Sequence, residues 1–148
     1  MRITIGSDHR GLQVKKKCIR CLTELGHDVV DVGTDEEASV DYPDFAKVVC
    51  EQVASGQSQR GILICGTGIG MVITANKFKG VRAANCADEV TAEICRRHND
   101  VNVLCLPGDF LGDRPVDDLI NVWLDTEFDG GRHQRRIEKI NALEDSID

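Results

Sequence analysis

No apolar run in this sequence approaches the roughly 20 consecutive residues that a membrane-spanning helix needs. A targeting segment is also missing, because a strand pattern already begins within Met1–Ile5. Basic residues are in deficit: 18 lysines and arginines face 25 aspartates and glutamates, which leaves a formal net charge of −7. Such a balance argues against general binding to nucleic acids or acidic membranes. We therefore expect a cytoplasmic globular protein without a nucleic-acid or membrane partner.

The seven cysteines lack the features of a disulfide framework or a zinc site. Their number is odd and no export signal accompanies them, so we interpret them as reduced thiols, most of them buried. Cys18 and Cys21 form a CxxC motif without a second CxxC elsewhere. They belong to one apolar helical stripe, formed by Val14, Cys18, Cys21, Leu22 and Leu25. The histidines have no HxxxH-like spacing and no carboxylate cluster, so we expect no bound metal.

Short apolar β-rich runs alternate with segments of helical periodicity. The expected strands are Arg2–Ile5, Asp28–Val32, Gly61–Cys65, Val81–Ala84 and Val101–Leu106. The expected helices are Leu12–Leu25, Asp44–Ala54, a segment from Met71 to about Asn76, Glu89–Arg97, Pro115–Leu124 and Arg132–Leu143. Strict β-α alternation predicts an α/β fold with a parallel sheet covered by helices on both faces. A length of 148 residues fits a single domain, residues 1–148.

The segment Ile62–Gly70 joins an apolar strand-like run, a cysteine and a glycine-rich turn. Glycines at positions 66, 68 and 70 let the backbone turn sharply and expose its N–H groups, and the next helix adds partial positive charge. This junction favours the thiolate form of Cys65 and predicts a reactive thiol beside an oxyanion cradle. The turn is neither a dinucleotide fingerprint nor a Walker A loop, and Met71 stands where a cysteine phosphatase has arginine. A plain structural turn is the alternative.

Polar residues gather where the expected strands end. Ser7-Asp8-His9-Arg10 follows the first strand and Cys65–Gly70 follows the third, at the edge where open α/β sheets bind ligands. His98-Asn99-Asp100 precedes the fifth strand, so we expect it at the opposite edge, where it can serve a neighbouring subunit's site. Each of these groups also has a structural interpretation, because Asp8 suits a helix N-cap and His98 a helix C-terminus.

Residues 130–136 read Gly-Gly-Arg-His-Gln-Arg-Arg and form a concentrated basic spot in an acidic chain. Arg132 and Arg136 lie one helical turn apart on one face. Cations at a helix start oppose the helix dipole, which is unfavourable unless an anion binds there. We expect a phosphate or carboxylate ligand. The alternative is a solvated face paired with Glu138 or Asp129.

Taken together, these segments resemble the ribose-5-phosphate isomerase B family, which also includes galactose-6-phosphate and allose-6-phosphate isomerases. The resemblance covers nearly the whole chain. Its motifs are Gly6-Ser7-Asp8-His9, Asp41-Tyr42-Pro43, Ile64–Gly70, Ala75-Asn76-Lys77, Gly80-Val81-Arg82-Ala83, Arg97-His98-Asn99-Asp100 and Gly130–Gln134. It implies a Rossmann-like three-layer sandwich with a five-stranded parallel sheet and an extra C-terminal helix. It also implies a homodimer, sometimes paired into a tetramer, whose active sites are built from both subunits.

The resemblance implies a cofactor-free and metal-free aldose–ketose isomerisation of a sugar phosphate through a cis-enediolate. Cys65 would be the base that moves a proton between C1 and C2, and Thr67 would help to stabilise the enediolate oxygen. His98 would assist ring opening, with Asp8 nearby. The implied binding residues are His9, Tyr42, Gly66, Gly68, Ile69, Gly70, Asn99, Arg132 and Arg136, of which His9, Arg132 and Arg136 would hold the phosphate.

One position departs from the family pattern. Many members carry an arginine that reaches the phosphate of the neighbouring subunit's site, and this chain has Asp109 there. We expect Arg114 to substitute for it from the same loop, so that ribose 5-phosphate is still accepted. A six-carbon aldose phosphate (allose or galactose 6-phosphate) is the alternative substrate. Two further alternatives are a non-catalytic sugar-phosphate-binding module and a nucleotide-binding regulatory protein, which the missing fingerprint disfavours.

Overall fold

The computed structural model describes residues 1–112 and 114–146, so residue 113 and the last two residues of the expected domain lie outside the described part. The strands are β1 (Arg2–Ser7), β2 (Asp28–Asp31), β3 (Arg60–Cys65), β4 (Ala83–Asn85) and β5 (Val103–Pro107). The helices are a 3₁₀ turn η1 (His9–Gly11), α1 (Leu12–Glu24), α2 (Tyr42–Ala54), α3 (Ile69–Ala75), α4 (Glu89–Asn99), α5 (Val116–Asp125) and α6 (Arg132–Glu144). None of the helices in these ranges is long and apolar enough to cross a membrane.

The strands form one parallel sheet in the order β2-β1-β3-β5-β4. The chain moves outward to β2 on one side of β1 and to β3 on the other, so the strand order reverses between β1 and β3. Parallel sheets bind ligands beyond the carboxyl ends of the strands at such a reversal. The register there pairs Ser7 with Ile64, so β1 and β3 end side by side.

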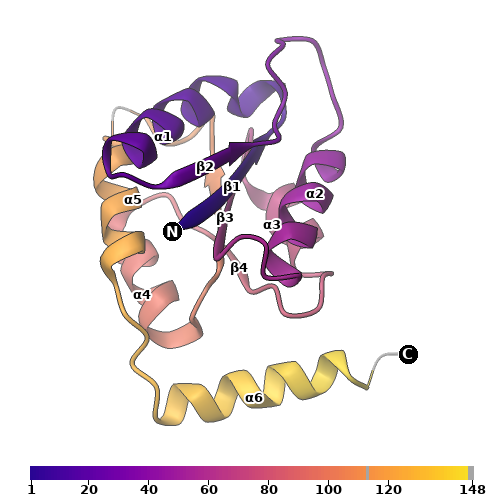
Figure 1. Cartoon of the computed structure of the whole chain (residues 1–148), viewed down its shortest axis with the longest axis vertical. Coiled ribbons are helices and arrows are strands. Elements are labelled where there is room, and N and C mark those ends of the chain that lie inside the picture. The colour runs from indigo at the N-terminus through magenta and orange to yellow at the C-terminus, as the bar shows by residue number, and fades with distance from the viewer. Residues whose placement is uncertain (113, 147–148) are drawn as a thin grey trace.

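Each face of the sheet has its own apolar core, and the strands carry apolar side chains to both. On one face α1, α4 and α5 pack around buried residues such as Ile5, Leu22 and Trp123. On the other face α2 and α3 pack around Val49, Leu63 and Met71 (Figure 1). The expected α/β three-layer sandwich with a five-stranded parallel sheet is therefore confirmed.

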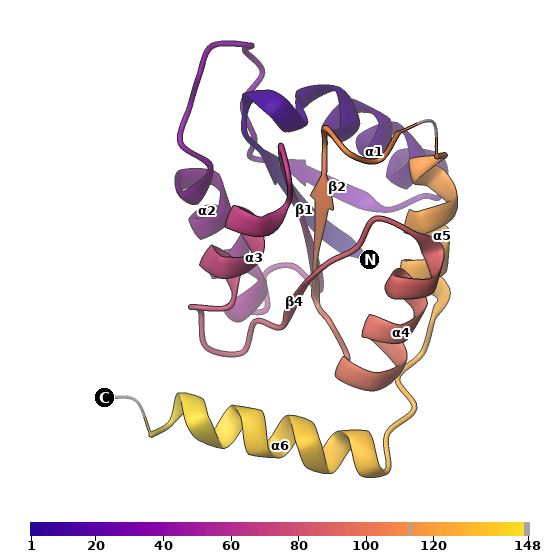
Figure 2. The same cartoon turned by 180° about the vertical axis from the view of Figure 1, so that it is seen from behind.

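The last helix, α6, stands outside these layers. Figures 1 and 2 show it running past the end of the sheet that lies opposite the carboxyl ends of the strands. Its first turn contacts α4, and its last turn reaches the segment after α3, where the Glu144 carboxylate accepts a hydrogen bond from Gly80 N (3.0 Å). Only His133 and Ile137 of this helix are buried. The extra C-terminal helix is thus present as expected, but most of its surface is left without a partner in the described part of this chain.

Most element boundaries agree with the sequence within two residues. The chief differences have local causes. Pro43 sits in the first turn of α2, a position that proline favours, and the helix therefore begins at Tyr42, before the expected Asp44. Asp8 caps the η1 turn before α1, where its carboxylate accepts hydrogen bonds from Arg10 N and Gly11 N.

Candidate active site

Cys65 is the last residue of β3 and lies at the point where the strand order reverses. It is 4% exposed. Its carbonyl oxygen accepts a hydrogen bond from Gly108 N (2.8 Å), which continues the β3–β5 pairing beyond the sheet. Backbone contacts thus fix the position of Cys65, and the glycine-rich turn begins at the next residue.

Within the turn from Gly66 to Gly70, one glycine has the left-handed backbone that glycine permits. Gly68 has φ of +75°, a conformation that residues with a Cβ rarely adopt. The Thr67 hydroxyl accepts a hydrogen bond from Ile69 N (3.2 Å), and the Asn85 amide donates to the Thr67 carbonyl (3.0 Å). The turn's own Thr67 side chain and the Asn85 side chain at the end of β4 therefore hold it in shape.

Two more glycines are required because side chains lie directly over them. A Cβ on Gly70 would come within 2.5 to 2.9 Å of the Tyr42 ring. A Cβ on Gly66 would lie 2.8 Å from an Asp109 oxygen and 2.9 Å from Arg10 Nε. The floor of the site is thus bare backbone, which lets three polar side chains approach it closely.

These side chains enclose a cavity of about 570 Å³ at the carboxyl end of the sheet. Its lining includes the predicted residues Asp8, Tyr42, Cys65, Gly66, Thr67, Ile69 and Gly70, and it is completed by Arg10, Ile73, Asp109 and Phe110. Asp8 is 5% exposed. The cavity therefore offers a thiol, two carboxylates, two hydroxyls and one guanidinium group around backbone N–H groups.

His9 lies beside this cavity without lining it. Its Nδ1 accepts a hydrogen bond from Val40 N (3.2 Å), so in the neutral ring the proton is on Nε2. The loop that precedes α2 thereby fixes the ring, and Nε2–H is left as a donor. Gly68 also lies outside the lining, because it packs against Asn85 and Leu106.

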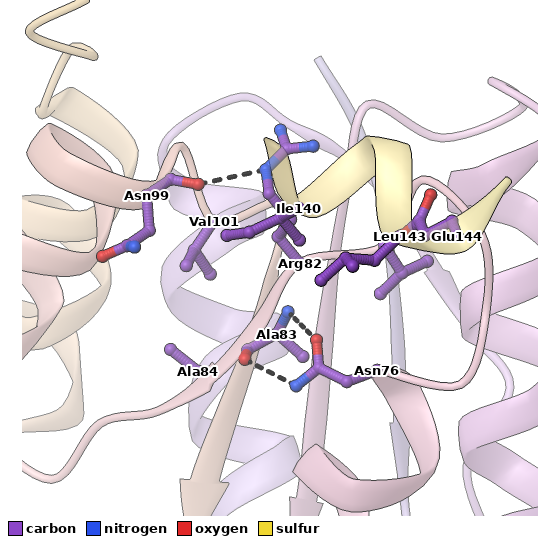
Figure 3. Close-up of a pocket in the computed structure, with 10 residues that line it drawn as sticks. Asn76, Arg82, Ala83, Ala84, Asn99, Val101, Ile140, Leu143 and Glu144 are labelled. Atoms are coloured by element: carbon purple, nitrogen blue, oxygen red, sulfur yellow. Dashed lines mark hydrogen bonds between the residues drawn. The ribbon is translucent and has the colours of Figure 1, made fainter. Parts of the chain in front are cut away.

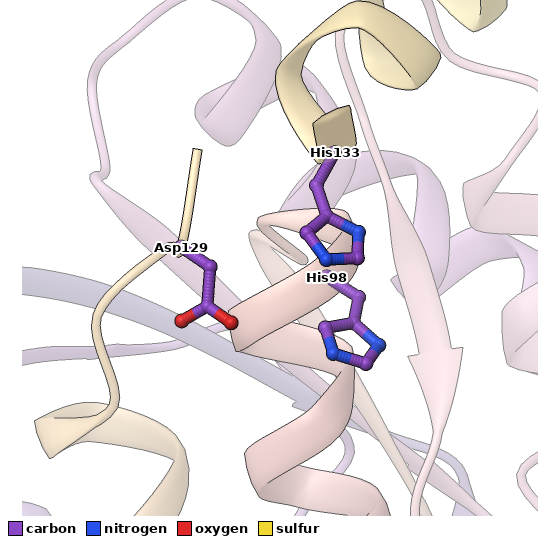
Figure 4. A group of neighbouring side chains, drawn as sticks. All are labelled: His98, Asp129 and His133. Atoms are coloured by element: carbon purple, nitrogen blue, oxygen red, sulfur yellow. The ribbon is translucent and has the colours of Figure 1, made fainter. Parts of the chain in front are cut away.

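The other predicted residues form a second group around the start of α6 and the end of α4. The rings of His98 and His133 stack with centroids 4.2 Å apart and planes 6° apart (Figure 4). Burial lowers the pKa of His133, and the nearby His98, Arg132 and Arg136 lower it further. Both arginines are exposed.

The expected alternative for the basic segment was a solvated face with local ion pairs. Asp129 instead pairs with Arg97 (3.2 Å), and Glu138 accepts a hydrogen bond from Gln134. Arg132 and Arg136 form no ion pair within residues 1–112 and 114–146. The two guanidinium groups are therefore free for an external anion.

One chain does not bring these two groups together. Cys65 ends a strand, whereas His98 and Asn99 precede β5, so the two groups lie at opposite ends of the sheet. A strand of five or six residues separates such ends by roughly 15–20 Å. His9 lies at the Cys65 end and Arg132 and Arg136 at the other, so the phosphate set expected from these three residues needs two chains and stays a prediction.

Comparison with known proteins assigns the chain to a family. The model of the ribose/galactose isomerase family matches residues 3–140. The chain belongs to this family. The ribose-5-phosphate isomerase B of Escherichia coli is 42% identical, with 97% of this chain and 96% of that protein covered.

Solved structures of the same family superpose closely. Ribose-5-phosphate isomerase B of Clostridium thermocellum matches with a TM-score of 0.97 and 45% identity over 100% of both chains. The enzyme of Mycoplasma genitalium, solved with bound ribulose-5-phosphate, matches with a TM-score of 0.93 and 44% identity over 97% of this chain and 96% of that one. The Rossmann-like fold expected from the sequence is therefore the family's fold.

Position 109 carries aspartate where the family resemblance leads us to expect arginine, and the structure shows where this aspartate lies. Asp109 lines the Cys65 cavity of its own chain and pairs with Arg10. Arg114 lies outside that cavity, and its guanidinium donates to the Ala87 carbonyl (2.9 Å). Its expected role at the phosphate of a neighbouring subunit's site stays a prediction. Arg10 was missed as a site residue, although its place in Ser7-Asp8-His9-Arg10 after β1 was a usable signal.

Two other features of the chain have the shape or the side chains of a binding site. A cavity of about 390 Å³ under α6 is lined mainly by apolar groups (Figure 3). Arg82 in this lining is already bound to the Asn99 and Asp100 carbonyls. His98, His133 and Asp129 place potential ligand atoms within 4.8 Å of one another. However, stacked rings direct their nitrogen lone pairs into separate planes, and Asp129 is held by Arg97, so we assign no ion there.

Proposed function

We propose that this protein interconverts ribose 5-phosphate and ribulose 5-phosphate through a cis-enediolate. The observation that carries the proposal is the thiol of Cys65 at the end of β3, beside a turn of bare backbone N–H groups and within the same cavity as Asp8. Membership of the ribose/galactose isomerase family and the ribulose-5-phosphate bound to a relative support it. The conversion is an internal redistribution of hydrogen, so no cofactor is proposed.

In this mechanism Cys65 acts as the base. Its thiolate removes the proton from C2 of the open-chain aldose, and the same proton, or one from solvent, is returned to C1. The C2 hydroxyl loses its proton and the C1 oxygen gains one, so that the C2 carbonyl of the ketose forms. The developing negative charge lies on the oxygens of C1 and C2. Thr67 and N–H groups of the turn from Gly66 to Gly70 would stabilise that charge, and their position in the Cys65 cavity supports this role. One such donor is typically worth about 3 kcal/mol.

We further propose that the working site needs two subunits. His98 and Asn99 would come from the partner's α4 to assist ring opening and to contact sugar oxygens, and the partner's Arg132 and Arg136 would bind the phosphate. The exposed arginines without ion pairs and the largely unpartnered α6 support this arrangement. Exposed apolar side chains beside the cavity, such as Ile69, Ile73 and Phe110, suit a subunit contact.

A homodimer, or a tetramer formed from two dimers, would therefore be the active form. A cytoplasmic location is part of the same proposal, because pentose phosphates are soluble metabolites and the thiols are free.

A coupled assay with ribose 5-phosphate, allose 6-phosphate and galactose 6-phosphate tests the substrate. We expect the highest kcat/KM with ribose 5-phosphate, together with incorporation of solvent deuterium at the carbon that gains the proton. Faster turnover of a six-carbon phosphate would reassign the substrate. Binding of ribose 5-phosphate without isomerisation would instead identify a non-catalytic binding module.

A further inference from the structure

The Cys65 cavity contains one basic side chain among the described residues that line it, and this is Arg10. The other charged groups in the lining are the carboxylates of Asp8 and Asp109. A sugar phosphate carries about 1.5 to 2 negative charges on its phosphate near neutral pH. Such a ligand can enter an otherwise acidic cavity only if a cation compensates the carboxylates.

Arg10 is held in place at both its backbone and its guanidinium group. Its backbone N–H donates to Asp8 Oδ1 (2.9 Å). Its Nε and Nη2 both reach Asp109 Oδ2, at 2.6 and 2.5 Å. Asp109 in turn is fixed by its backbone N–H, which donates to the Gly66 carbonyl (3.0 Å).

The pair lies directly over the glycine turn. A Cβ on Gly66 would come within 2.9 Å of Arg10 Nε and 2.8 Å of Asp109 Oδ2, so residue 66 has to be glycine for the pair to occupy this place. An ordinary surface ion pair contributes little and makes no such demand on a neighbouring backbone. The Arg10–Asp109 pair instead packs directly against the glycine turn that forms the floor of the site.

Arg10 keeps donors for a ligand. A guanidinium group has five N–H donors, and two of them are directed at Asp109. The side chain is 60% exposed, against 30% for Asp109. The remaining edge of Arg10 is therefore open, and a planar edge with two or more N–H groups matches the oxygens of a phosphate.

We propose that Arg10 binds the phosphate group of the substrate, and that it is the residue in this chain that supplies a guanidinium group from the Cys65 side of the site. This inference rests on the proposed function. The oxygens of the enediolate already have donors in Thr67 and the glycine turn, whereas at this end of the sheet the phosphate otherwise has only His9 Nε2. Arg10 and His9 are consecutive residues, so one turn of chain presents both donors.

The test compares Arg10→Gln with Arg20→Gln, a change of an equally exposed arginine that pairs with Asp117 outside the cavity. For Arg10→Gln we expect a rise of about tenfold or more in KM for ribose 5-phosphate and an equal rise in the inhibition constant of inorganic phosphate, with kcat changed by less than about threefold. Arg20→Gln should leave these values within about twofold. Inhibition by ribose, which lacks phosphate, should be equal in both variants.

Unchanged KM and unchanged phosphate inhibition in Arg10→Gln would overturn the proposal and leave a structural ion pair. A fall in kcat at constant KM would also overturn it, because Arg10 would then act on the reacting oxygens. Thermal unfolding checks that the variant folds; if it does not, Arg10→Lys, which keeps the charge but not the planar edge, should show an intermediate rise in KM. Direct titration of the protein with inorganic phosphate measures the same site even if isomerase activity were absent.

Discussion

At the scale of single residues, the chemistry open to each cysteine depends on whether its side chain reaches the cavity. Cys65 is almost fully buried, yet it lines the cavity, because the glycines that follow it leave the floor uncovered. Cys18, Cys21 and Cys50 are also buried, but they pack in the two cores and line no part of that cavity. Burial raises the pKa of Cys50 to about 12. Such thiols remain protonated at neutral pH and react slowly.

Replacement of Cys65 by alanine should therefore abolish isomerisation, because no other thiol can take the proton from carbon. Inhibition by inorganic phosphate should stay near the wild-type value, since the thiol acts on carbon and not on phosphate. Steady-state kinetics measures both. Cys50→Ala is the matched control and should keep most of the activity; more than about a tenth of wild-type kcat in Cys65→Ala would remove Cys65 from the role of base.

The arginines at the start of α6 give a second prediction at this scale. Arg132→Ala and Arg136→Ala should each weaken binding of ribose 5-phosphate by roughly 1.5–3 kcal/mol, the value of a charge-assisted hydrogen bond. Arg135→Ala should have a smaller effect, according to the family pattern. The comparison uses KM and phosphate inhibition for the three variants. Equal losses at positions 135 and 136 would contradict this choice.

At the scale of elements, a buried lysine joins α1 to the loop before α2. Lys15 is 1% exposed, and its ammonium group contacts Asp31 (2.7 Å), Asp35 (3.1 Å) and the Thr34 carbonyl (2.8 Å). The loop from Thr34 onward leads to Val40, whose N–H holds the His9 ring. Lys15 thus supports the cavity from a distance. Its spacing of three residues from both Leu12 and Cys18 puts it on the buried face of α1, and this signal was missed.

Lys15→Ala should lower the free energy of unfolding by roughly 3 kcal/mol, because it removes a fully buried side chain and leaves Asp31, whose side chain is 31% exposed, without its cation. Lys16→Ala, an exposed lysine on the same helix, should change it by less than about 0.5 kcal/mol. Urea unfolding of both variants measures the difference. Equal stability in the two variants would show that the lysine cluster contributes no net stabilisation.

The contact between α4 and α6 should make stability depend on pH. The pKa of His133 is lowered in the folded protein, chiefly by burial and then by its cationic neighbours, from an unfolded value of about 6.5. The unfolded chain therefore binds a proton more readily than the folded protein. The free energy of unfolding is thus highest above about pH 6.5 and decreases as the pH drops below it. In His133→Gln, the decrease in the melting temperature between about pH 7 and pH 5 should be smaller than in the wild type. A parallel decrease in both proteins would contradict this assignment.

At the scale of the whole molecule, the two groups of site residues lie at opposite ends of one sheet. A single chain offers Cys65, Asp8 and Tyr42 at one end and His98, Asn99 and the basic start of α6 at the other. A pairing of two chains that sets these ends against each other would complete two sites at once. Such a pairing, if it forms as proposed, would account for the position of α6 beyond the sheet rather than against a core.

Mixing Cys65→Ala chains with His98→Ala chains should restore activity after subunit exchange, because the mixed dimer contains one site with neither substitution. Each variant alone should be inactive or nearly so. Mass spectrometry of the intact dimer verifies the exchange. If verified mixed dimers remain inactive, Cys65 and His98 of the same chain serve one site, or each site is active only when the other is intact.

The fold class of this protein and the backbone turn of its site were determined by the sequence alone. Alternation of apolar strands with amphipathic helices specifies a parallel sheet covered on both faces, and glycines at positions 66, 68 and 70 specify a bare turn after Cys65. These features depend on periodicity and local backbone freedom, which neighbouring residues decide. The Arg10–Asp109 pair, the Lys15 cluster and the separation of Arg132 from Cys65 were decided by the tertiary structure. They join residues that are far apart in the chain, and only the packing of strands and helices determines which charges meet.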